Sequence, residues 1–449
     1  MFNVNKIIVL LFFVFLSLSL FFLIKDFNTD ESLKGYYKIY LYFFLILSLL
    51  FFIAIILNNK FKIYLLVIFC SLVSSLYLFE FYIFKKGDIN FLKRDLDNWE
   101  NKFYYLQKEI KKQDAYTAFS YEDDKIFSLS GLQNSKILMC NESGYWAKYY
   151  SDRYGFNNPD NVWERKNIDI VFIGDSFTKG ECVNQGSEIT SQLRKLQNLN
   201  IINLGWQATG PLRQFATYRE FIKDKQTKYI FWVYFEENDL DDLSRERNNK
   251  ILMEYFNNAS FNQNLMSADI KKKVFNLILN KHDEFMKKEF EINDNIKRYT
   301  NLINYIKLYK TRQIILGNLH KKFFENKNNL LIKNYKDENL DFYFKLFDKF
   351  SDELSKKTKI VLVYLPKEKY GFTSGFDRSS KIKRTILSEL EKRNIDIIDI
   401  DTKIKDNFFN PGDLYPKQHV GMHFNEKGYK FVAEKINEYL IKDIKNNAN

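Results

Sequence analysis

Four short segments of the chain hold residue types that together could carry out nucleophilic catalysis. Residues 168–180 form an apolar, β-branched run that stops at a Gly-Asp-Ser motif, in which the serine is Ser176. This pattern predicts a buried strand that ends in a tight loop. Gly205, Asn238 and His423 follow later, each close to the end of a predicted strand or the start of a predicted helix. In parallel α/β sheets, loops at the carboxyl ends of strands are where chemistry is placed.

These four residues supply the groups that acyl chemistry needs. A serine hydroxyl is a weak nucleophile until an imidazole takes its proton, and the resulting oxyanion needs preset donors. We expect Ser176 to be the nucleophile and His423 the base, and we expect the backbone N–H groups of Ser176 and Gly205 and the amide of Asn238 to form the oxyanion hole. His419 is the alternative base, but the asparagine and glycine after His423 favour His423. Taken singly, each residue also fits a helix cap, a turn or a loop.

The elements around these residues indicate a parallel sheet. Besides the strand before Ser176, strand patterns cover residues 200–204, 229–235, 359–365 and 395–400. Helical patterns separate them, at residues 188–196, 214–223, 379–393 and 426–441. Such alternation predicts helices on both faces of a parallel sheet. The interval of about 241–358 has no strand pattern and reads as amphipathic helices, so we expect an inserted helical subdomain there.

Three apolar runs precede this region, at residues 7–24, 39–57 and 63–84. A membrane-spanning helix needs roughly 20 apolar residues. Because no small-residue cleavage site follows the first run and two more runs come after it, we expect three transmembrane helices instead of a cleaved signal peptide. The lysines and arginines on the two sides do not decide the orientation.

These features divide the chain into three predicted parts. Residues 1–86 form the membrane anchor, residues 87–140 an amphipathic helical linker, and residues 141–449 the catalytic domain. In the linker, apolar residues recur at spacings of four and three from Leu92 to Ile110, which is typical of a helix with one apolar stripe.

Composition excludes some classes of function. The 449-residue chain carries a net charge of +12 that is spread along its length, with no dense basic block, so no nucleic-acid partner is expected. No cluster of residues has metal-ligand spacing and no glycine-rich phosphate loop is present, so no metal or cofactor is expected. Of the three cysteines, Cys140 and Cys182 could pair in an oxidising compartment, and the sequence leaves this open.

Residues 169–439 resemble the SGNH, or GDSL-type, hydrolase family, which is named after the four residue types. The matching positions are Gly174-Asp175-Ser176-Phe177, Gly205, Asn238-Asp239, and His423 followed by Asn425 and Gly428. The resemblance implies a flavodoxin-like three-layer α/β/α fold, a serine nucleophile and a histidine base. Family members include esterases, lipases, carbohydrate deacetylases and O-acyltransferases of envelope glycans.

The expected function is therefore that of a membrane-anchored serine esterase or deacylase. Its expected partners are an acylated carbohydrate or another acyl ester, the membrane, and proteins of envelope-glycan biosynthesis. We expect the catalytic domain to be extracytoplasmic, or periplasmic, and its substrate to belong to envelope or extracellular polysaccharide. The alternatives are an O-acyltransferase of cell-surface glycan and a catalytically silent glycan-binding or assembly protein.

Two positions depart from the family pattern. Glu236 stands where the third block usually begins with glycine, and Val420 stands where an aspartate usually precedes the histidine by three residues. The acid orients the imidazole, and in serine proteases its neutral replacement lowers kcat about 10⁴-fold. Three explanations are open. A backbone carbonyl orients His423, an acid from elsewhere such as Asp413 or Glu237 replaces the aspartate, or the site is silent.

Overall fold

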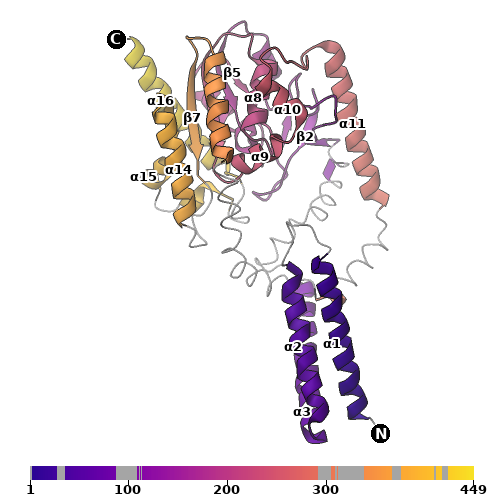
Figure 1. Cartoon of the computed structure of the whole chain (residues 1–449). Helices are drawn as coiled ribbons and strands as arrows, with labels where there is room; N and C mark the ends of the chain where they lie inside the picture. The colour runs from indigo at the N-terminus through magenta and orange to yellow at the C-terminus, as the bar shows by residue number, and fades with distance from the viewer. Residues whose placement is uncertain are drawn as a thin grey trace. The chain divides into compact units, whose positions relative to one another are not determined.

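The computed structural model divides the chain into two units (Figure 1). One unit contains Met1–Arg94 and Ile292–Asn329, and the other contains Asp95–Glu291 and Leu330–Asn449. The structure describes residues 3–27, 36–86, 109–110, 112, 114–291, 305–308, 311, 338–366, 376–408, 411–416 and 423–448. The predicted stripe at residues 92–110 therefore lies outside the described residues, apart from its last two positions.

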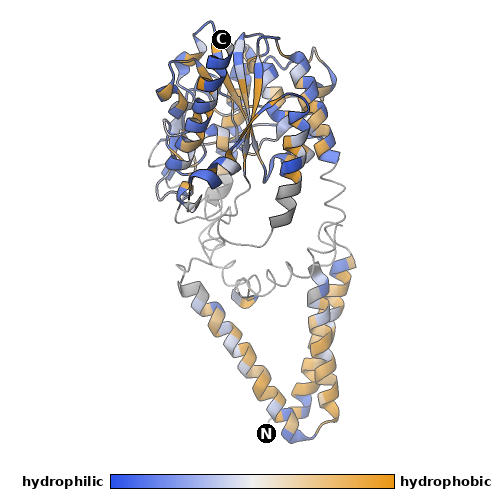
Figure 2. Cartoon of the chain, turned by 90° about the vertical axis from the view of Figure 1, so that its left-hand side faces the viewer, coloured by the Kyte–Doolittle hydropathy of each residue, from blue (hydrophilic) through white to orange (hydrophobic). Residues whose placement is uncertain are grey.

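The first unit is built on three apolar helices, α1 (Val4–Phe27), α2 (Tyr36–Ile56) and α3 (Asn59–Lys86). Figure 2 shows apolar residues along most of their length. Two stretches, Val4–Phe27 and Asn59–Tyr82, are long and apolar enough to cross a membrane, by length and composition alone. In α2 the apolar stretch Tyr40–Ile56 is shorter. The structure thus gives two candidate spans, and the expected third remains a prediction.

A short part of the predicted helical insertion belongs to this first unit. The buried carboxylate of Glu80, near the end of α3, accepts hydrogen bonds from the backbone N–H and the hydroxyl of Thr311, at 2.7 and 2.6 Å. The Tyr77 hydroxyl donates to the carbonyl of Ile306 at 2.8 Å. The sequence alone placed the whole insertion in the globular domain. The structure instead assigns part of it to the first unit.

The globular unit is organised around a sheet of five parallel strands. These are β4 (Ile168–Ile173), β5 (Ile201–Asn203), β6 (Thr227–Phe235), β7 (Lys359–Leu365) and β8 (Asp396–Asp399). They lie in the order β5-β4-β6-β7-β8 and pair in parallel throughout, which confirms the predicted parallel α/β architecture. Numbered along the chain the order is 2-1-3-4-5, as in flavodoxin-like folds. The strand order reverses between β4 and β6, where such sheets open a crevice at their carboxyl ends.

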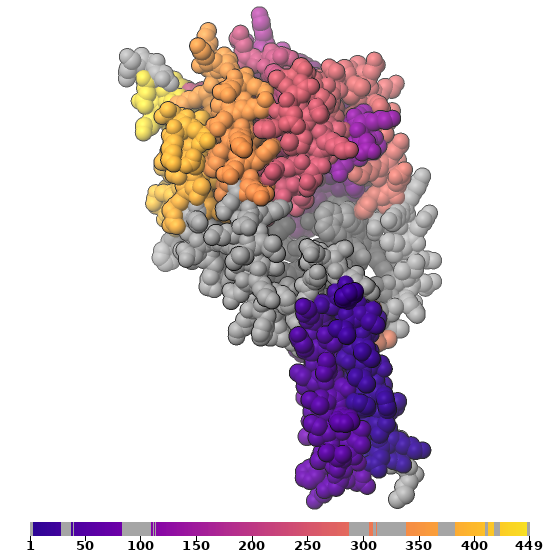
Figure 3. Space-filling model, viewed as in Figure 1, coloured from indigo at the N-terminus to yellow at the C-terminus, as the bar shows by residue number. Residues whose placement is uncertain are grey.

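Helices cover both faces of this sheet because successive strand residues point to opposite sides. In β4, Val171 and Ile173 join a core that also holds residues of α8, of helical residues 338–353 and of α14. Ile170 and Phe172 join a second core with α7, α15 and α16. The predicted interval of about 241–358 is helical or irregular wherever it is described. In Figure 3 the atoms of this interval and of α14, coloured from rose to orange, lie on the face of the globular unit in view. The remaining bounds are α6 (Ser176–Lys179), α7 (Ile189–Leu196), α8 (Pro211–Phe221), α9 (Asp239–Glu246), α10 (Lys250–Asn257), α11 (Ala268–Glu291), α14 (Phe376–Glu391), α15 (Ile400–Asn407), α16 (Glu426–Ala448), and the 3₁₀ helices Asp160–Trp163 and Pro411–Leu414.

A second, smaller sheet precedes the first strand of the large one. It contains β1 (Tyr116–Thr117), β2 (Lys136–Leu138) and β3 (Lys148–Tyr150), and β2 and β3 form an antiparallel hairpin. The predicted boundary between linker and domain, at residue 141, falls within the loop of this hairpin. The globular unit therefore begins earlier than the sequence indicated, and residues 114–140 are not a helical linker.

The outer edge of β3 is held by a segment that follows α6. The Lys148 N–H donates to the side chain of Asn184 at 3.1 Å, and the Gln185 N–H donates to the Lys148 carbonyl at 3.0 Å. The Tyr150 N–H donates to the side chain of Gln185 at 3.1 Å. These hydrogen bonds attach the hairpin to the segment that follows β4 and α6.

Trp232 in β6 is expected to be a main source of stability. Its indole ring lies 5.0–5.8 Å, centroid to centroid, from the rings of Tyr343, Phe347 and Phe350, and its N–H donates to Gln214 at 2.5 Å. We predict that Trp232→Ala lowers the free energy of unfolding of the full chain by about 3–5 kcal/mol, measured by denaturation in detergent. The control Leu196→Ala, at a position 46 % exposed, should change it by less than about 0.5 kcal/mol. An equally small loss for Trp232→Ala would contradict the packing of helical residues 338–353 on β6.

Candidate active site

Ser176 stands at the start of a single helical turn immediately beyond β4. Strand β4 ends at Ile173, and the Asp175 side chain then caps α6 by accepting the Phe177 N–H at 2.9 Å. One turn later the helix ends at Gly180, whose φ of +84° is the left-handed conformation that favours glycine. The abrupt change from strand to turn fixes the backbone of Ser176, which is 9 % exposed. The strand-to-loop prediction for this segment is confirmed.

His423 meets Ser176 from the segment that leads into α16. Its Nε2 atom lies 2.9 Å from the Ser176 Oγ atom, and its ring packs 5.1 Å from that of Phe177, centroid to centroid. The structure thus brings together the two residues that the sequence proposed as nucleophile and base, although they are 247 positions apart. For Nε2 to accept the serine proton, the neutral imidazole must carry its own proton on Nδ1.

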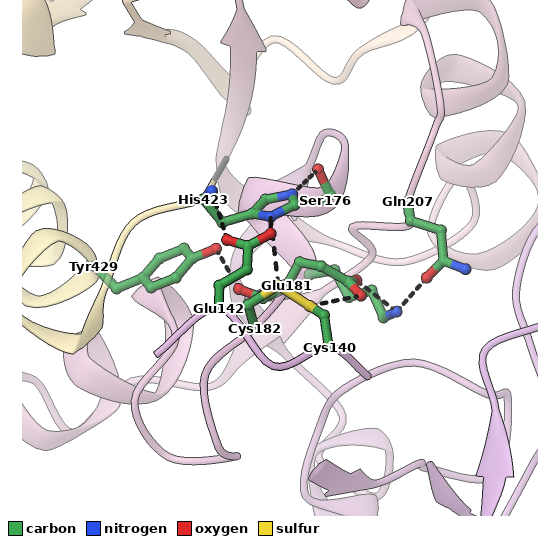
Figure 4. The surroundings of a disulfide bond; sticks show 9 residues. Cys140, Glu142, Ser176, Glu181, Cys182, Gln207, His423 and Tyr429 are labelled. Carbon is green, nitrogen blue, oxygen red and sulfur yellow. Dashed lines mark hydrogen bonds and ion pairs between the residues drawn. A yellow bond between two sulfur atoms is a disulfide. The ribbon is translucent and has the colours of Figure 1, made fainter. Parts of the chain in front are cut away.

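Glu142 is the acid that holds Nδ1. One carboxylate oxygen lies 3.1 Å from His423 Nδ1, and the other accepts the backbone N–H of His423 at 2.9 Å. Figure 4 shows the imidazole between Ser176 on one side and Glu142 on the other. The Glu142 side chain is only 7 % exposed, so this interaction is screened little by solvent. The three residues form a Ser–His–Glu arrangement in which each member orients the next.

Of the three explanations that the sequence left open, the geometry fits an acid from elsewhere in the chain, but the acid is neither of the two residues named as examples. The Asp413 side chain is 49 % exposed and lies 3.8 Å from the Lys427 ammonium group, and Glu237 is exposed. Both lie near His423 or Asn238 along the chain. Glu142 lies 281 residues before His423, in a segment that matched none of the four motifs. Position 420 lies outside the described residues.

A disulfide between Cys140 and Cys182 ties the loop that carries Glu142 to the segment that follows Ser176. The sequence left this pairing open, and the structure contains it. Cys140 follows β2, and two hydrogen bonds close the loop there. The Met139 N–H donates to the Ala147 carbonyl, and the Ala147 N–H donates to the Cys140 carbonyl. Cross-linking residues 42 positions apart stabilises a fold by about 4 kcal/mol in the chain-entropy model.

The same three side chains are the one group of metal-ligating type in the part of the chain that the structure describes. The ligand atoms of Cys140, Glu142 and Cys182 all lie within 4.8 Å of one another. Thiolate is the form in which cysteine binds metals, and both sulfurs here are bonded to each other. In the disulfide form this cluster does not fit a metal ion.

Charges around His423 favour its protonated form. Burial lowers the pKa of His423, but the carboxylates of Glu142, Glu181 and Asp175 act in the opposite direction, and the pKa is raised above its ordinary value. The neighbouring carboxylates thus stabilise the protonated ring. This suits a histidine that acts as a base, because such a histidine forms imidazolium during the reaction. Burial also raises the pKa of Asp175 to about 6, against the lowering effects of the Phe177 N–H, of His423 and of the Asn238 side chain.

Of the three predicted oxyanion donors, Asn238 and Ser176 lie at the site, whereas the N–H of Gly205 is already hydrogen-bonded. Asn238 follows β6 and precedes α9, and its side chain interacts with Asp175, beside the nucleophile. Ser176 begins α6, where N–H groups have no partner within the helix. The Gly205 N–H, however, donates to the Asn203 side chain at 2.8 Å, so this predicted donor is already occupied.

Gly205 has a packing role that its motif did not indicate. A Cβ atom on Gly205 would lie 2.3 Å from the Lys179 backbone nitrogen, so only glycine lets this loop approach α6. Lys179, which is fully buried, adds a second link between the two segments. Its ammonium group contacts the carboxylate of Glu181 at 2.8 Å and the side chain of Gln207, and lies 4.8 Å from the Trp206 ring centroid. The sequence gave no signal for this buried ion pair.

Comparisons with known proteins add little to this geometry. No family model matches the chain, and no curated protein matches it. Among solved structures, the chain is similar to a protein from Desulfitobacterium hafniense DCB-2 that is provisionally assigned to the G-D-S-L family of lipolytic proteins. The identity is 13 %, the match covers 61 % of this chain and 99 % of that chain, and the TM-score is 0.30. At this TM-score the likeness supports no conclusion, so the site is interpreted from its own geometry.

We predict that Glu142→Gln slows the phosphonylation of Ser176 by a fluorophosphonate probe by up to about 10⁴-fold, because the amide cannot stabilise the imidazolium. The rate should be measured against pH on the full chain. Since Glu142 raises the pKa of His423, the substitution should also move the rising limb of the rate profile to lower pH.

Asp413→Asn and Glu237→Gln serve as matched controls, because they remove the two acids that sequence position favoured. Both should leave the rate and the pH profile close to those of the unaltered chain. A large loss in either control, with little change in Glu142→Gln, would show that the acid has been assigned to the wrong residue.

Proposed function

We propose that this chain is a membrane-anchored serine hydrolase of acyl esters, with Ser176 as nucleophile, His423 as general base and Glu142 as the acid. The observation that carries the proposal is the continuous contact from the Ser176 hydroxyl through both imidazole nitrogens to the Glu142 carboxylate, at 2.9 and 3.1 Å. Three segments that are distant in sequence converge to make it. Convergence of this kind is the geometric criterion by which such triads are recognised on unrelated folds.

The first half-reaction forms an acyl-enzyme. The Ser176 Oγ atom attacks the ester carbonyl carbon while His423 Nε2 takes the hydroxyl proton, and Glu142 stabilises the imidazolium that forms. The Ser176 N–H and the Asn238 side chain donate to the oxyanion. When the tetrahedral intermediate collapses, the bond to the leaving alcohol breaks, and the alcohol oxygen receives the proton from Nε2.

The second half-reaction releases the acyl group. A water molecule, deprotonated by His423, attacks the acyl carbon of the Ser176 ester, and collapse of the second oxyanion returns the proton to the serine. A carbohydrate hydroxyl in place of water would give acyl transfer with the same groups. We take hydrolysis as the proposed outcome, and analysis of the products distinguishes it from transfer.

The presence of Glu142 weakens the case for a silent site. That alternative depended on the missing aspartate at position 420, and an acid on His423 Nδ1 makes such an aspartate unnecessary. A glycan-binding or assembly protein would need neither a base aligned on a serine nor an acid behind it. If the activity test below detects no turnover, that result would support the glycan-binding or assembly function.

The proposed substrate is an acyl ester of envelope or extracellular polysaccharide, and the proposed location of the globular unit is extracytoplasmic. The two apolar helices support attachment to a membrane. The Cys140–Cys182 disulfide supports the location, since disulfides persist in oxidising compartments and are rare in the cytosol. The resemblance of the four motifs to a family that contains glycan deacetylases supports the class of substrate.

We predict that the full chain in detergent hydrolyses p-nitrophenyl acetate and releases acetate from O-acetylated polysaccharide, and that Ser176→Ala abolishes both activities. Ser260→Ala, which removes an exposed serine from the loop after α10, is the matched control and should retain full activity. Equal rates in the unaltered chain and in Ser176→Ala, or no rate with any ester offered, would overturn the proposal.

We further predict that Asn238→Ala lowers kcat about 10²–10³-fold with little change in KM, because an oxyanion donor acts mainly in the transition state. Steady-state kinetics on p-nitrophenyl acetate measures both constants. Asn407→Ala, at an exposed position at the end of α15, should leave them unchanged. A rise in KM at constant kcat would instead assign Asn238 to ground-state binding.

A further inference from the structure

The Cys140–Cys182 disulfide lies directly against the proposed catalytic residues. Cys140 is two positions before Glu142, and Cys182 is six positions after Ser176. The Cys182 Sγ atom is 3.5 Å from His423 Nδ1, the same nitrogen that Glu142 contacts. In Figure 4 the two sulfurs lie beside Glu142 and the imidazole. The bond therefore joins the acid-bearing loop to the nucleophile-bearing turn at the point where both meet the base.

The position of Glu142 depends on a loop with short supports. Strands β2 and β3 have three residues each, and the loop between them spans residues 139–147. The N–H groups of Lys148 and Tyr150 donate to the side chains of Asn184 and Gln185, which holds β3, on the far side of this loop. The disulfide holds its near side, at Cys140. The loop that carries Glu142 is thus held on both sides. Of the two supports, the disulfide at Cys140 is closer to Glu142 along the chain than β3 is.

Small displacements matter for such an acid. Glu142 contacts both Nδ1 and the backbone N–H of His423, which requires the carboxylate to keep one position and one orientation. A shift of about 1 Å in a catalytic group can lower a rate about 10²-fold. Reduction would also leave a thiol at Cys182 within reach of the nitrogen that Glu142 must contact.

We infer that the Cys140–Cys182 disulfide positions the acid of the triad, so that full activity requires the oxidised pair. The inference rests on the proposed hydrolase function and adds a condition to it. Reduction by a dithiol transfers two electrons and two protons to the disulfide and yields two cysteine thiols, while the dithiol becomes a disulfide. A newly made chain in a reducing compartment would then have about 10²-fold lower activity, and oxidation after export would complete its active site.

The test compares the unaltered full chain with Cys140→Ala/Cys182→Ala in detergent, with p-nitrophenyl acetate as substrate. The expected result is a fall in kcat of about 10²-fold with KM little changed. Cys70→Ala is the matched control, because Cys70 is exposed in α3 and is not part of a disulfide, and it should be fully active. Melting curves establish that each variant is folded at the assay temperature.

A double-mutant cycle separates positioning from general support of the fold. If the disulfide acts through Glu142, the cysteine substitutions should change kcat little when Glu142→Gln is already present, because the contribution of the acid is already lost. They should also move the rising limb of the pH profile to lower pH, as Glu142→Gln does. The same 10²-fold loss in both backgrounds would show that the disulfide supports the fold alone, and would overturn the inference.

Dithiothreitol treatment of the unaltered chain is a second measurement that needs no variant to fold. With reduction verified by mass spectrometry and a chelator present to prevent metal capture by the new thiols, kcat should fall, whereas the double-cysteine variant should not respond. Full activity in a fully reduced, folded chain would overturn the inference while leaving the hydrolase function intact. An oxidised chain without Ser176-dependent activity would instead overturn the proposed function.

Discussion

The interaction between Glu142 and His423 is the constraint on which the rest of the site depends. A histidine beside a serine acts as a base only if its other nitrogen is protonated and held, since otherwise the ring can turn or present the wrong tautomer. Glu142 meets this requirement with both oxygens, one on Nδ1 and one on the backbone N–H. The second contact also fixes the chain at the point where it enters α16.

The fold brings three remote segments to this interaction. Strand β4 carries Ser176 to the carboxyl edge of the sheet, and the segment before α16 carries His423 to the same edge. The β2–β3 hairpin, which precedes the large sheet in sequence, carries Glu142 there. The Tyr429 hydroxyl, from α16, donates to the Glu181 carbonyl at 2.9 Å, and the disulfide begins one residue later at Cys182. The helix behind the base and the loop behind the acid are therefore attached to the same short stretch after α6.

Much of the fold was predictable because its elements have strong local patterns. The central parts of β4, β6 and β7 are buried on both faces, so each appears in the sequence as an apolar run. The shorter edge strands β5 and β8 were located as well, so all five strands were predicted. The motifs around Ser176, Asn238 and His423 follow strands or precede a helix, which made their meeting at one edge predictable. The hairpin that bears Glu142 was missed because its strands have three residues each and are rich in tyrosine and lysine, with no alternation long enough to read.

Other errors have equally local causes. Asp413 and Glu237, which were named as possible acids, lie near His423 or Asn238 along the chain, but nearness along the chain says nothing about contacts between residues 281 positions apart. Gly205 was assigned to the oxyanion hole by its motif, whereas its N–H is used by Asn203 two residues before it. The cysteine pair was the one available signal, because a bond between Cys140 and Cys182 would have placed Glu142 within a few residues of the nucleophile turn.

The most direct test of this account is the titration of His423 by NMR in the full chain labelled with ¹⁵N-histidine. The chain has four histidines, so His423→Gln identifies its signals by their loss. The account predicts that neutral His423 carries its proton on Nδ1, and that its pKa lies above the ordinary histidine value and falls in Glu142→Gln. A proton on Nε2 in the neutral form, or a pKa that Glu142→Gln leaves unchanged, would contradict the assignment of Glu142 as the acid of the triad.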